Sequence, residues 1–303
     1  MGSEMCIRDR FKSLLDFYES KYGPYPGNST GLVTDVVPSA INYALETQDR
    51  PFFPNSASRG TTYHELMHQW WGDNVAPTDW NDIPLNEGPA QYSEFQFPYE
   101  GAGSTTTTTE QANFALWTQR SNGANAPWNV APAAMTRAQD LFGSQVYERG
   151  SMALEALRTG IGASTFETLM RNYQVMYGGG QITGRRIAAF QAMAENLSGR
   201  DLSTFFNTWY FTTGRPPWPV KFNLTLAGPT EQLGGGSAAS YTLSVKNTGK
   251  VAMPAAGTSI TLDATDILDD ATVGTLPAGV TQAGNTFTSV SYTHLTLPTN
   301  REV

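Results

Sequence analysis

The sequence contains a single cysteine, Cys6, among its 303 residues. One cysteine excludes a disulfide framework and a zinc site built from several thiolates. Charged residues make up only 15% of the chain, and lysine and arginine form no cluster along it. The chain therefore has no positive stripe to follow a phosphate backbone, which argues against a nucleic acid as partner.

Long hydrophobic runs are also missing. No apolar segment approaches the roughly 18 residues that a membrane-spanning helix needs, so we expect no transmembrane segment. The first residues lack the basic and then apolar profile of a secretory signal. What is present is a chain with 40% hydrophobic residues and a net charge of −8. This composition predicts an acidic, folded protein of about two domains.

The two ends differ in composition from their neighbours. Residues 1–10 and 290–303 show no hydrophobic period and resemble the end sequences that result when sequencing adaptor is translated into protein. We therefore exclude both segments from the predicted fold. The alternative is that they are ordinary disordered termini. As adaptor artefacts they would make the chain an internal fragment, and the missing signal would then carry no information on localisation.

The central region carries helical periodicity. Phe11, Leu14 and Tyr18 are spaced as one face of a helix, which predicts a helix over 11–22. We expect short strands at 31–37 and 40–45, and helices at 63–71, 90–96, 110–119, 132–141, 146–158, 165–177, 187–197 and 201–213. Two strands followed by a run of helices indicate an α+β, mostly helical domain over residues 11–218.

The pattern changes after residue 218. Hydrophobic and polar residues alternate at 221–226, 240–246 and 260–263, and glycine, proline and asparagine separate these segments. Such alternation is typical of half-buried strands. We interpret residues 219–289 as a truncated β-sandwich module of the immunoglobulin-like kind.

The segment 64–68 reads HELMH and has the H-E-x-x-H pattern. On a helix, residues i and i+4 lie one turn apart on the same face, so both imidazoles can reach one metal ion while Glu65 lies beside it. The alternative is a helix that carries two ordinary polar histidines. Against it, His64 and His68 are the only histidines of the chain outside the C-terminal segment that we exclude.

Glu87, in the segment LNEG, offers a third ligand. The 18 residues between His68 and Glu87 are rich in turn formers, so a second helix can return antiparallel and direct its carboxylate at the same point. Two histidines and a glutamate with an open fourth position form a catalytic zinc site, whereas a closed structural site needs a further His or Cys. We predict that His64, His68 and Glu87 bind one Zn²⁺ ion.

The segment 64–94 resembles the aminopeptidase N (membrane alanyl aminopeptidase) family of gluzincin zinc metallopeptidases. That family combines HExxHxWxG, a loop containing tryptophan, and LNEG, and this chain has HELMHQWWG, a tryptophan in the following loop, and LNEG. The similarity continues at 146–150, which reads VYERG, and at 209–217, and covers about residues 11–219.

This resemblance implies a zinc peptidase with a thermolysin-like catalytic domain and the same three zinc ligands. Glu65 is then the general base: zinc lowers the pKa of bound water toward about 7, and Glu65 passes the proton of that water to the leaving amine. From the residues alone, Tyr147 is better interpreted as a buried tyrosine with a satisfied hydroxyl. The resemblance reverses this preference and implies that Tyr147 stabilises the oxyanion. Glu94 either accepts the free N–H of a ligand histidine or is a solvated helix residue.

Exopeptidases of this family recognise the substrate's free amine with the glutamate of a GxMEN motif. The corresponding segment 43–48 reads YALETQ, so only the glutamate carries over, as Glu46. We expect Glu46 to lie at a sheet edge and pair with the ammonium group of the substrate. An exposed charge at a strand end is the alternative.

Pro89 stands where the family has an aromatic residue. Inside a helix, proline removes one backbone hydrogen bond, which is tolerated near the first turn. We therefore expect Glu87 to lie close to the start of its helix.

Together these features predict a zinc-dependent peptidase that acts on peptides and most readily releases N-terminal residues. A zinc endopeptidase and a non-catalytic surface-binding module are the alternatives. The family's N-terminal β-domain, which helps to close the substrate site, has no counterpart here, so the chain alone is expected to be inactive if closure requires that domain. A lysine-poor composition with an appended sandwich favours a secreted or cell-surface parent protein. The oligomeric state is not indicated.

Overall fold

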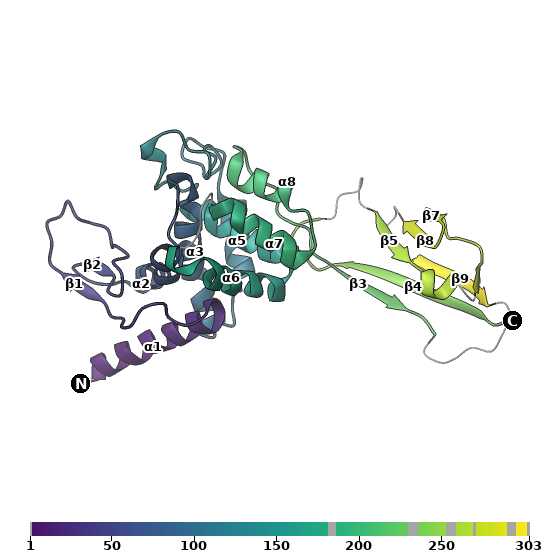
Figure 1. Ribbon diagram of the computed structural model, residues 1–303, viewed down its shortest axis with the longest axis horizontal. Helices are drawn as coiled ribbons and strands as arrows, with labels where there is room; N and C mark the ends of the chain where they lie inside the picture. Colours follow the sequence, from purple (N-terminus) through teal and green to yellow (C-terminus); the bar gives the residue numbers. More distant parts are fainter. Residues whose placement is uncertain are drawn as a thin grey trace. The chain divides into compact units, whose positions relative to one another are not determined.

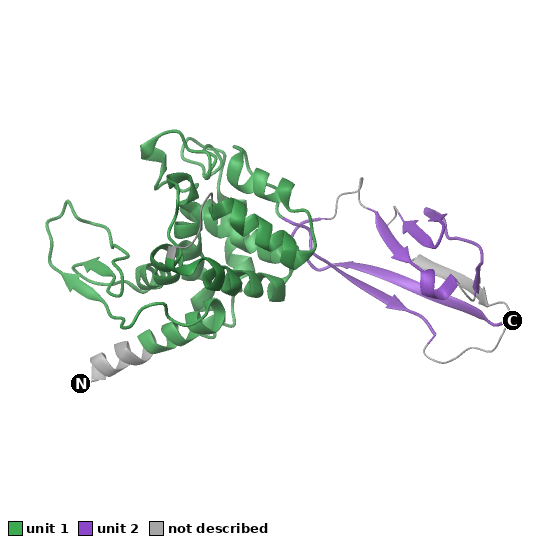
Figure 2. Ribbon diagram, viewed as in Figure 1, with its two compact units in different colours: residues 1–218 green, residues 219–303 purple. Residues whose placement is uncertain are grey.

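The computed structural model describes residues 2–180, 186–229, 236–252, 259–268, 271–289 and 295–301, of which 2–10, 180 and 295–301 are described by their backbone alone. The chain divides into two compact units, Met1–Trp218 and Pro219–Val303 (Figure 2). Helices predominate in the first unit and strands in the second (Figure 1).

The first unit is a group of packed helices with one small sheet. Its helices are α1 (Gly2–Tyr22), α2 (Arg59–Met67), α3 (Pro84–Gln96), α4 (Thr109–Gln119), α5 (Tyr147–Ile161), α6 (Ala163–Tyr177), α7 (Arg186–Ser198) and α8 (Ser203–Phe206). Its strands are β1 (Val33–Asp35) and β2 (Phe52–Pro54). Short helical turns are η1 (Gln69–Asn74), η2 (Trp80–Asp82), η3 (Phe97–Gly101), η4 (Ala138–Asp140), η5 (Gly178–Gly180) and η6 (Asn207–Phe211).

The predicted helix at 132–141 is wrong. Only the single turn η4 is helical there, because the backbone of this segment bonds to distant parts of the unit. The N–H of Ala133 donates to the C=O of Tyr210 at 2.8 Å, and the N–H of Met135 donates to Oδ1 of Asn81 at 2.6 Å. These tertiary bonds replace the bonds that a local helix would make.

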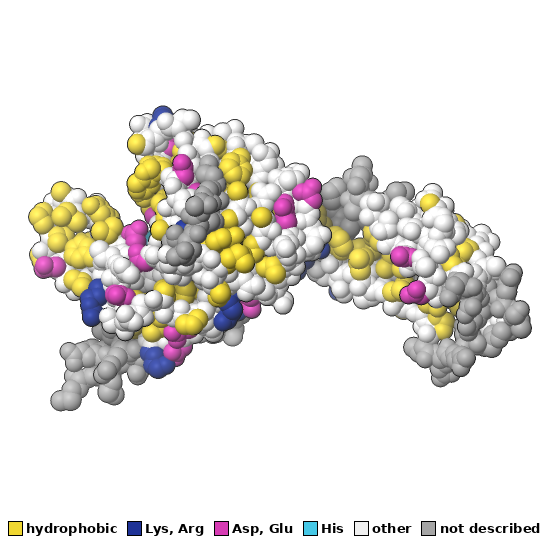
Figure 3. Space-filling model, in the orientation of Figure 1, with side chains coloured by type: hydrophobic (Ala, Val, Ile, Leu, Met, Phe, Trp, Pro, Cys, Tyr) yellow, Lys and Arg dark blue, Asp and Glu magenta, His cyan; other side chains and the backbone are white. Residues whose placement is uncertain are grey.

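The predicted strand at 40–45 is also wrong, apart from one antiparallel bridge between Leu45 and Phe52. The partner of β1 is instead β2, which pairs with it in parallel and which the sequence did not predict. Hydrophobic side chains gather on the surface at this sheet (Figure 3); Val36, for example, is 83% exposed. Parallel sheets are normally covered on both faces, so this part of the unit presents unusual apolar surface.

The structure describes part of both ends of the chain, which the predicted fold left out. The backbone of residues 2–10 continues α1 and that of Leu295–Arg301 forms strand β9. The origin of the two ends in translated adaptor stays a prediction. Residues 1, 290–294 and 302–303 lie outside the described residues.

Buried aromatic residues hold the end of α2 in the core. Trp70 donates its indole N–H to the C=O of Gly23 at 3.0 Å and packs edge-on against Tyr18. Trp71 stacks on Tyr173 of α6, with ring centroids 5.4 Å apart. Helix α3 packs against both α2 and α5. The two helices that flank α3 are therefore fixed relative to it.

The second unit contains two antiparallel sheets. One has the strand order β3-β4-β9-β6 and the other β5-β8-β7. The elements are β3 (Phe222–Ala227), β4 (Ala238–Asn247), β5 (Ile260–Asp263), α9 (Thr265–Leu268), β6 (Ala271–Val273), β7 (Val280–Ala283), β8 (Thr286–Ser289) and β9 (Leu295–Arg301). Leu243 from one sheet and Phe287 from the other belong to one buried hydrophobic cluster.

The strands predicted at 221–226, 240–246 and 260–263 correspond to β3, β4 and β5. Among the described residues, no helix has the length and apolarity required to cross a bilayer.

Candidate metal centre

Helix α2 presents the two histidines. It begins after Ser58, whose Oγ accepts a hydrogen bond from the N–H of Thr61 at 3.2 Å and caps the helix. His64 lies in its last turn and His68 caps its C-terminal end, one turn further along. Both imidazoles are buried, and their ring centroids are 4.9 Å apart. The H-E-x-x-H spacing thus brings both rings to one face of the helix.

Helix α3 presents the carboxylate. It begins with Pro84, a favoured first residue because a helix leaves that N–H unbonded. Glu87 lies in this first turn, buried, and donates its backbone N–H to the C=O of Ile83 at 3.0 Å. The helix continues through Pro89 to Gln96, so it begins six residues earlier than the predicted helix at 90–96.

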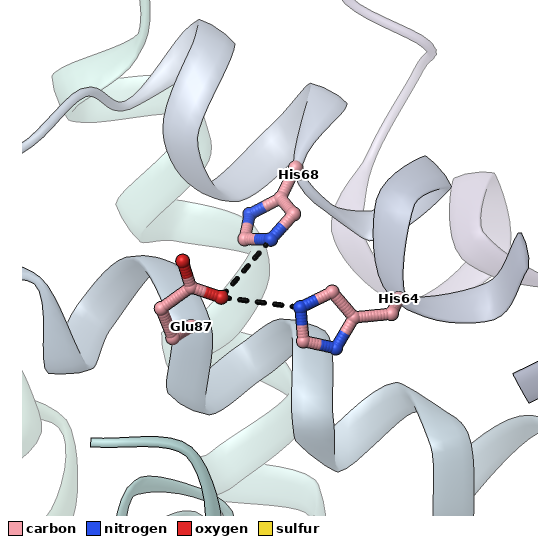
Figure 4. A group of neighbouring side chains, drawn as sticks. All are labelled: His64, His68 and Glu87. Carbon is pink, nitrogen blue, oxygen red and sulfur yellow. Dashed lines mark hydrogen bonds and ion pairs between the residues drawn. The ribbon is translucent and has the colours of Figure 1, made fainter. Parts of the chain in front are cut away.

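The three predicted ligands converge on one point. Nε2 of His64 lies 3.1 Å from Oε2 of Glu87, and Nε2 of His68 lies 3.2 Å from the same oxygen (Figure 4). Ligand atoms about 2.0–2.2 Å from a tetrahedral zinc ion would lie roughly 3.3–3.6 Å apart, slightly farther than these two distances. The three side chains therefore already have nearly the spacing, and the chemistry, of a single zinc site.

The outer nitrogens of the two rings are also engaged. Nδ1 of His64 lies 3.0 Å from Oε1 of Glu94. Nδ1 of His68 lies 3.0 Å from the C=O of Trp71 and 3.2 Å from Oδ1 of Asn86. Hydrogen bonds at Nδ1 orient an imidazole and leave Nε2 free for a metal. The contact of Glu94 agrees with one of its two predicted roles, whereas sequence reasoning missed Trp71 and Asn86.

Gly72 makes room for the contact between Asn86 and His68. Its φ is +143°, a conformation that side chains rarely adopt, and a Cβ there would lie 2.3 Å from Oδ1 of Asn86. The sequence offered one signal for each of these two residues. Gly72 is the glycine of HELMHQWWG and Asn86 is the asparagine of LNEG, and each motif also supplies a predicted metal ligand.

The three ligands shift one another's pKa values, because the carboxylate and the imidazoles carry charges of opposite sign. Burial raises the pKa of Glu87, but His68 and His64 lower it by more, so that it falls to about 2. Burial lowers the pKa of His68, yet Glu87 and the nearby Glu46 and Glu65 raise it more, to about 10. The pKa of His64 is also raised, because hydrogen bonds to Glu87 and Glu94 outweigh its burial. The carboxylates around the site thus favour positive charge on the two imidazoles.

Two further carboxylates lie beside the ligands. Glu65 is buried, and burial raises its pKa to about 7, with opposition from His68 and His64. Glu46 precedes β2 in the chain, and one of its oxygens, one of Glu65 and a nitrogen of His68 all lie within 4.8 Å of one another. Two elements distant in sequence therefore bring Glu46 and Glu65 to the same side of the centre.

Tyr147 is the first residue of α5 and approaches from a third helix. Its ring stacks on that of His64, with centroids 5.8 Å apart and planes inclined by 28°. Burial, together with the charges of Glu87, Glu46 and Glu65, raises the pKa of its phenol well above the usual value. The phenol therefore remains a hydrogen-bond donor at neutral pH.

Two histidines from one helix and a carboxylate from the next, with a buried glutamate beside them, have the arrangement found in zinc metallopeptidase domains. Residues 45–209 match the Peptidase family M1 domain. This match covers more than half of the chain, which belongs to peptidase family M1.

Known relatives agree with this assignment. The chain is 28% identical to aminopeptidase N of Streptomyces lividans over 160 residues. This aligned region covers 51% of the chain and 18% of the relative. It is 28% identical over 192 residues to endoplasmic reticulum aminopeptidase 1 of Rattus norvegicus, which covers 56% of the chain and 20% of the relative. The chain thus spans about a fifth of the length of these relatives.

The structure resembles that of an M1 zinc metallopeptidase of Deinococcus radiodurans, solved with a Tyr-Ser-Ala substrate bound. The TM-score is 0.57 at 26% identity, and the match covers 68% of this chain and 44% of that one.

Proposed function

We propose that this chain carries the catalytic centre of a zinc-dependent peptidase that releases N-terminal amino acids from peptides. The observation that carries the proposal is the convergence of His64 and His68 on one oxygen of Glu87, with Glu65 alongside. The names of the relatives, which are aminopeptidases, support the reaction. The substrate class is further supported by the peptide bound to the metallopeptidase of Deinococcus radiodurans.

His64, His68 and Glu87 would hold one zinc ion, which supplies a Lewis acid that polarises a carbonyl group and lowers the pKa of water. Glu94, Asn86 and the C=O of Trp71 keep the two imidazoles oriented. Proton transfer, stabilisation of the oxyanion and binding of the substrate's amine are the work of further residues of the chain.

Glu65 is the general base in this proposal. Its pKa of about 7, raised by burial, suits a group that takes a proton from water and later returns it to the leaving amine. Tyr147 donates its phenol proton in a hydrogen bond to the oxygen that becomes negative as the carbonyl is attacked. Removal of such a donor typically costs 10²- to 10³-fold in rate.

Glu46 fixes the position of cleavage in the same proposal. Its carboxylate lies within 4.8 Å of a carboxylate oxygen of Glu65 and a nitrogen of His68, where it can pair with the free ammonium group of a peptide. An endopeptidase would not need this group. Peptides with a free and with an acetylated N-terminus distinguish the two reactions, and equal cleavage of both would favour the endopeptidase.

The catalytic role of Glu65 is tested by Glu65→Ala. We expect this variant to retain one zinc ion per chain, because the three ligands are unchanged, and to lose hydrolysis of aminoacyl anilides. Glu167→Ala, at a 42%-exposed side chain on α6, serves as control and should keep full activity. Turnover by Glu65→Ala equal to that of the parent would contradict the proposal. Zinc content near zero in a folded parent chain would favour the non-catalytic binding module.

Two broader proposals concern the whole protein. A thermolysin-like arrangement in the first unit and a β-sandwich in the second are supported by the order of helices and by the hydrophobic cluster that takes residues from both sheets. We also propose that the full-length protein is exported, on the basis of its lysine-poor composition. Expression of the full-length coding sequence with fractionation of cells and medium tests this location.

A further inference from the structure

Helices α3 and α5 touch through their backbones at one pair of glycines. A Cβ on Gly150 of α5 would lie 2.8 Å from Cα of Gly88 on α3 and 3.4 Å from the C=O of Pro84. A Cβ on Gly88 would lie 3.1 Å from both Cα and the carbonyl carbon of Gly150. Ordinary contacts of a Cβ begin near 3.4 Å, so a methyl group on Gly150 requires the helices to separate by about 0.6 Å.

This crossing lies between a predicted zinc ligand and the predicted oxyanion donor. Gly88 directly follows Glu87 in α3. Gly150 follows Tyr147 by three residues, so both lie on the same face of α5. Any change in the separation at the crossing is therefore transmitted to the distance between Glu87 and Tyr147.

The other side of the first turn of α5 is fixed by Arg149, which is fully buried. Its Nε donates to the C=O of Trp209 at 2.9 Å, and its Nη2 donates to the C=O groups of Thr208 and Thr212, each at 2.7 Å. These bonds tie the first turn of α5 to η6 and Thr212, so they resist a local rotation that would absorb an added methyl group. The first turn, with Tyr147, therefore shifts together with the segment to which Arg149 is bonded.

The zinc ligands touch α5 only through Tyr147, whose ring stacks on that of His64 and whose phenol lies against Glu87 among the described contacts. His64 and His68 belong to α2 and its C-terminal cap, Glu87 belongs to α3, and the contacts at Nδ1 of both rings come from α3 and from Trp71. No predicted ligand belongs to α5. A displacement of α5 therefore moves the phenol directly, whereas the backbone that carries the three ligands belongs to α2, its cap and α3.

We infer that Gly150, packed against Gly88, is a positioning residue that sets the place of the Tyr147 phenol relative to the metal centre. This inference deepens the proposed function and rests on it. A displacement of about 1 Å at a reacting group can cost about 10²-fold in rate, so we expect Gly150→Ala to lower kcat by about 10- to 100-fold, with KM and zinc content close to those of the parent.

A double-mutant cycle tests whether Gly150 acts through Tyr147. If it does, Gly150→Ala should have little further effect on kcat in a Tyr147→Phe background, because the displaced hydroxyl is already missing. Gly160→Ala, the same substitution near the end of the same helix, is the matched control and should leave kcat unchanged. Additive effects of Gly150→Ala and Tyr147→Phe would overturn the inference.

A second readout does not depend on activity. In the full chain labelled with 3-fluorotyrosine, the ¹⁹F resonance of residue 147 is identified by its absence from Tyr147→Phe. We expect added Zn²⁺ to shift this resonance in the parent and in Gly160→Ala, and to shift it less in Gly150→Ala. An identical zinc response in the parent and Gly150→Ala would overturn the inference, even if the parent hydrolysed no peptide. If the zinc responses of the parent and Gly150→Ala differ but the parent hydrolyses no peptide, the proposed function is contradicted and the inference on Gly150 is not.

Gly88→Ala extends the test if Gly150→Ala does not fold. The contact that it creates is less close, 3.1 Å against 2.8 Å, so the same pattern should appear with a smaller loss of kcat and a smaller change of the ¹⁹F response. Loss of zinc from a folded Gly88→Ala or Gly150→Ala would show that the crossing sets the ligands rather than the phenol, and would also overturn the inference.

Discussion

In the candidate centre, protons compete with a metal ion for the nitrogen atoms of the histidine ligands. The neighbouring carboxylates raise the pKa of His68 to about 10, so its imidazole carries a proton at neutral pH before a metal binds. The pKa of His64 is raised as well, by its hydrogen bonds to Glu87 and Glu94. Zinc requires neutral imidazole ligands, so its binding must release the protons that they carry.

We therefore expect the affinity for zinc to rise with pH, by up to about a hundredfold per unit where both histidines are protonated. Chelator competition at several pH values between 6 and 8 measures the dissociation constant. Calorimetry in buffers of different ionisation enthalpy counts the protons released. An affinity that stays constant over this range, with no proton release, would show that the histidines are already neutral.

Glu155 of α5 is a buried carboxylate that the candidate centre does not use. It accepts a hydrogen bond from the phenol of Tyr92 at 2.6 Å, and Arg158 lies 3.7 Å away. Burial raises its pKa from 4.5 to about 7, although Arg158 and Tyr92 oppose this shift. Between these two values the folded chain binds more protons than the unfolded chain. The contribution of Glu155 to the free energy of unfolding therefore falls as the pH rises from about 4.5 to 7.

Glu155→Gln should remove this cost while it keeps an acceptor for Tyr92. We expect the variant to exceed the parent in free energy of unfolding by up to about 3 kcal/mol at pH 8, with no such gain at pH 4. Urea unfolding monitored by tryptophan fluorescence measures both values. Glu167→Gln, at a more exposed side chain, should show no comparable difference between the two pH values. A gain for Glu155→Gln that is equal at pH 4 and pH 8 would refute the linkage.

Single residues were predictable where their chemistry follows from spacing. His64 and His68 are four residues apart, which fixes their common face on any helix, and the LNEG motif identified Glu87. Asn86 and Gly72 were missed because their roles depend on a contact between two helices, with a Cβ on Gly72 only 2.3 Å from the Asn86 oxygen. Spacing within one segment carries no information on such a contact.

At the scale of elements, the first turn of α5 depends on Arg149. The guanidinium is fully buried and faces backbone carbonyl groups rather than a carboxylate, and burial lowers its pKa to about 10. It joins α5 to the turn η6 and to the residue that follows it, Thr212. Each buried acceptor left without a partner costs roughly 1–3 kcal/mol.

We expect Arg149→Met to lower the free energy of unfolding by more than about 3 kcal/mol, because five backbone carbonyl groups each lose a donor. Arg137→Met removes an exposed guanidinium that pairs with Asp140, and should change the same quantity far less, because solvent screens a surface ion pair. Chemical denaturation of both variants provides the comparison. Equal losses in the two variants would show that the buried bonds contribute no more than a surface pair.

Elements were predictable where one hydrophobic face determines the structure. The segments predicted at 146–158 and 165–177 became α5 and α6, because each buries a stripe with helical period. The segment 132–141 failed because the N–H groups of Ala133 and Met135 bond to Tyr210 and Asn81, which are distant in sequence. The strand β2 was missed because its three residues are too few to show the alternation of hydrophobic and polar residues by which a strand is predicted.

At the scale of the whole molecule, the two units can be followed separately. All seven tryptophans lie within residues 1–218. Among the described residues, the groups of histidine and carboxylate that could hold a metal also lie there. Tryptophan fluorescence therefore reports on the unit that carries the candidate centre, whereas calorimetry reports on both.

We expect zinc to raise the melting temperature of the first unit alone. A ligand that binds only the folded state at a thousand times its dissociation constant adds about 4 kcal/mol, which corresponds to a shift on the order of 10 °C for a unit of this size. The transition seen by fluorescence should shift with zinc, return with chelator, and lose its response in Glu87→Ala. Any calorimetric transition absent from the fluorescence should stay in place. A zinc-dependent shift that persists in Glu87→Ala would place the metal elsewhere, because that substitution removes the oxygen on which both imidazoles converge.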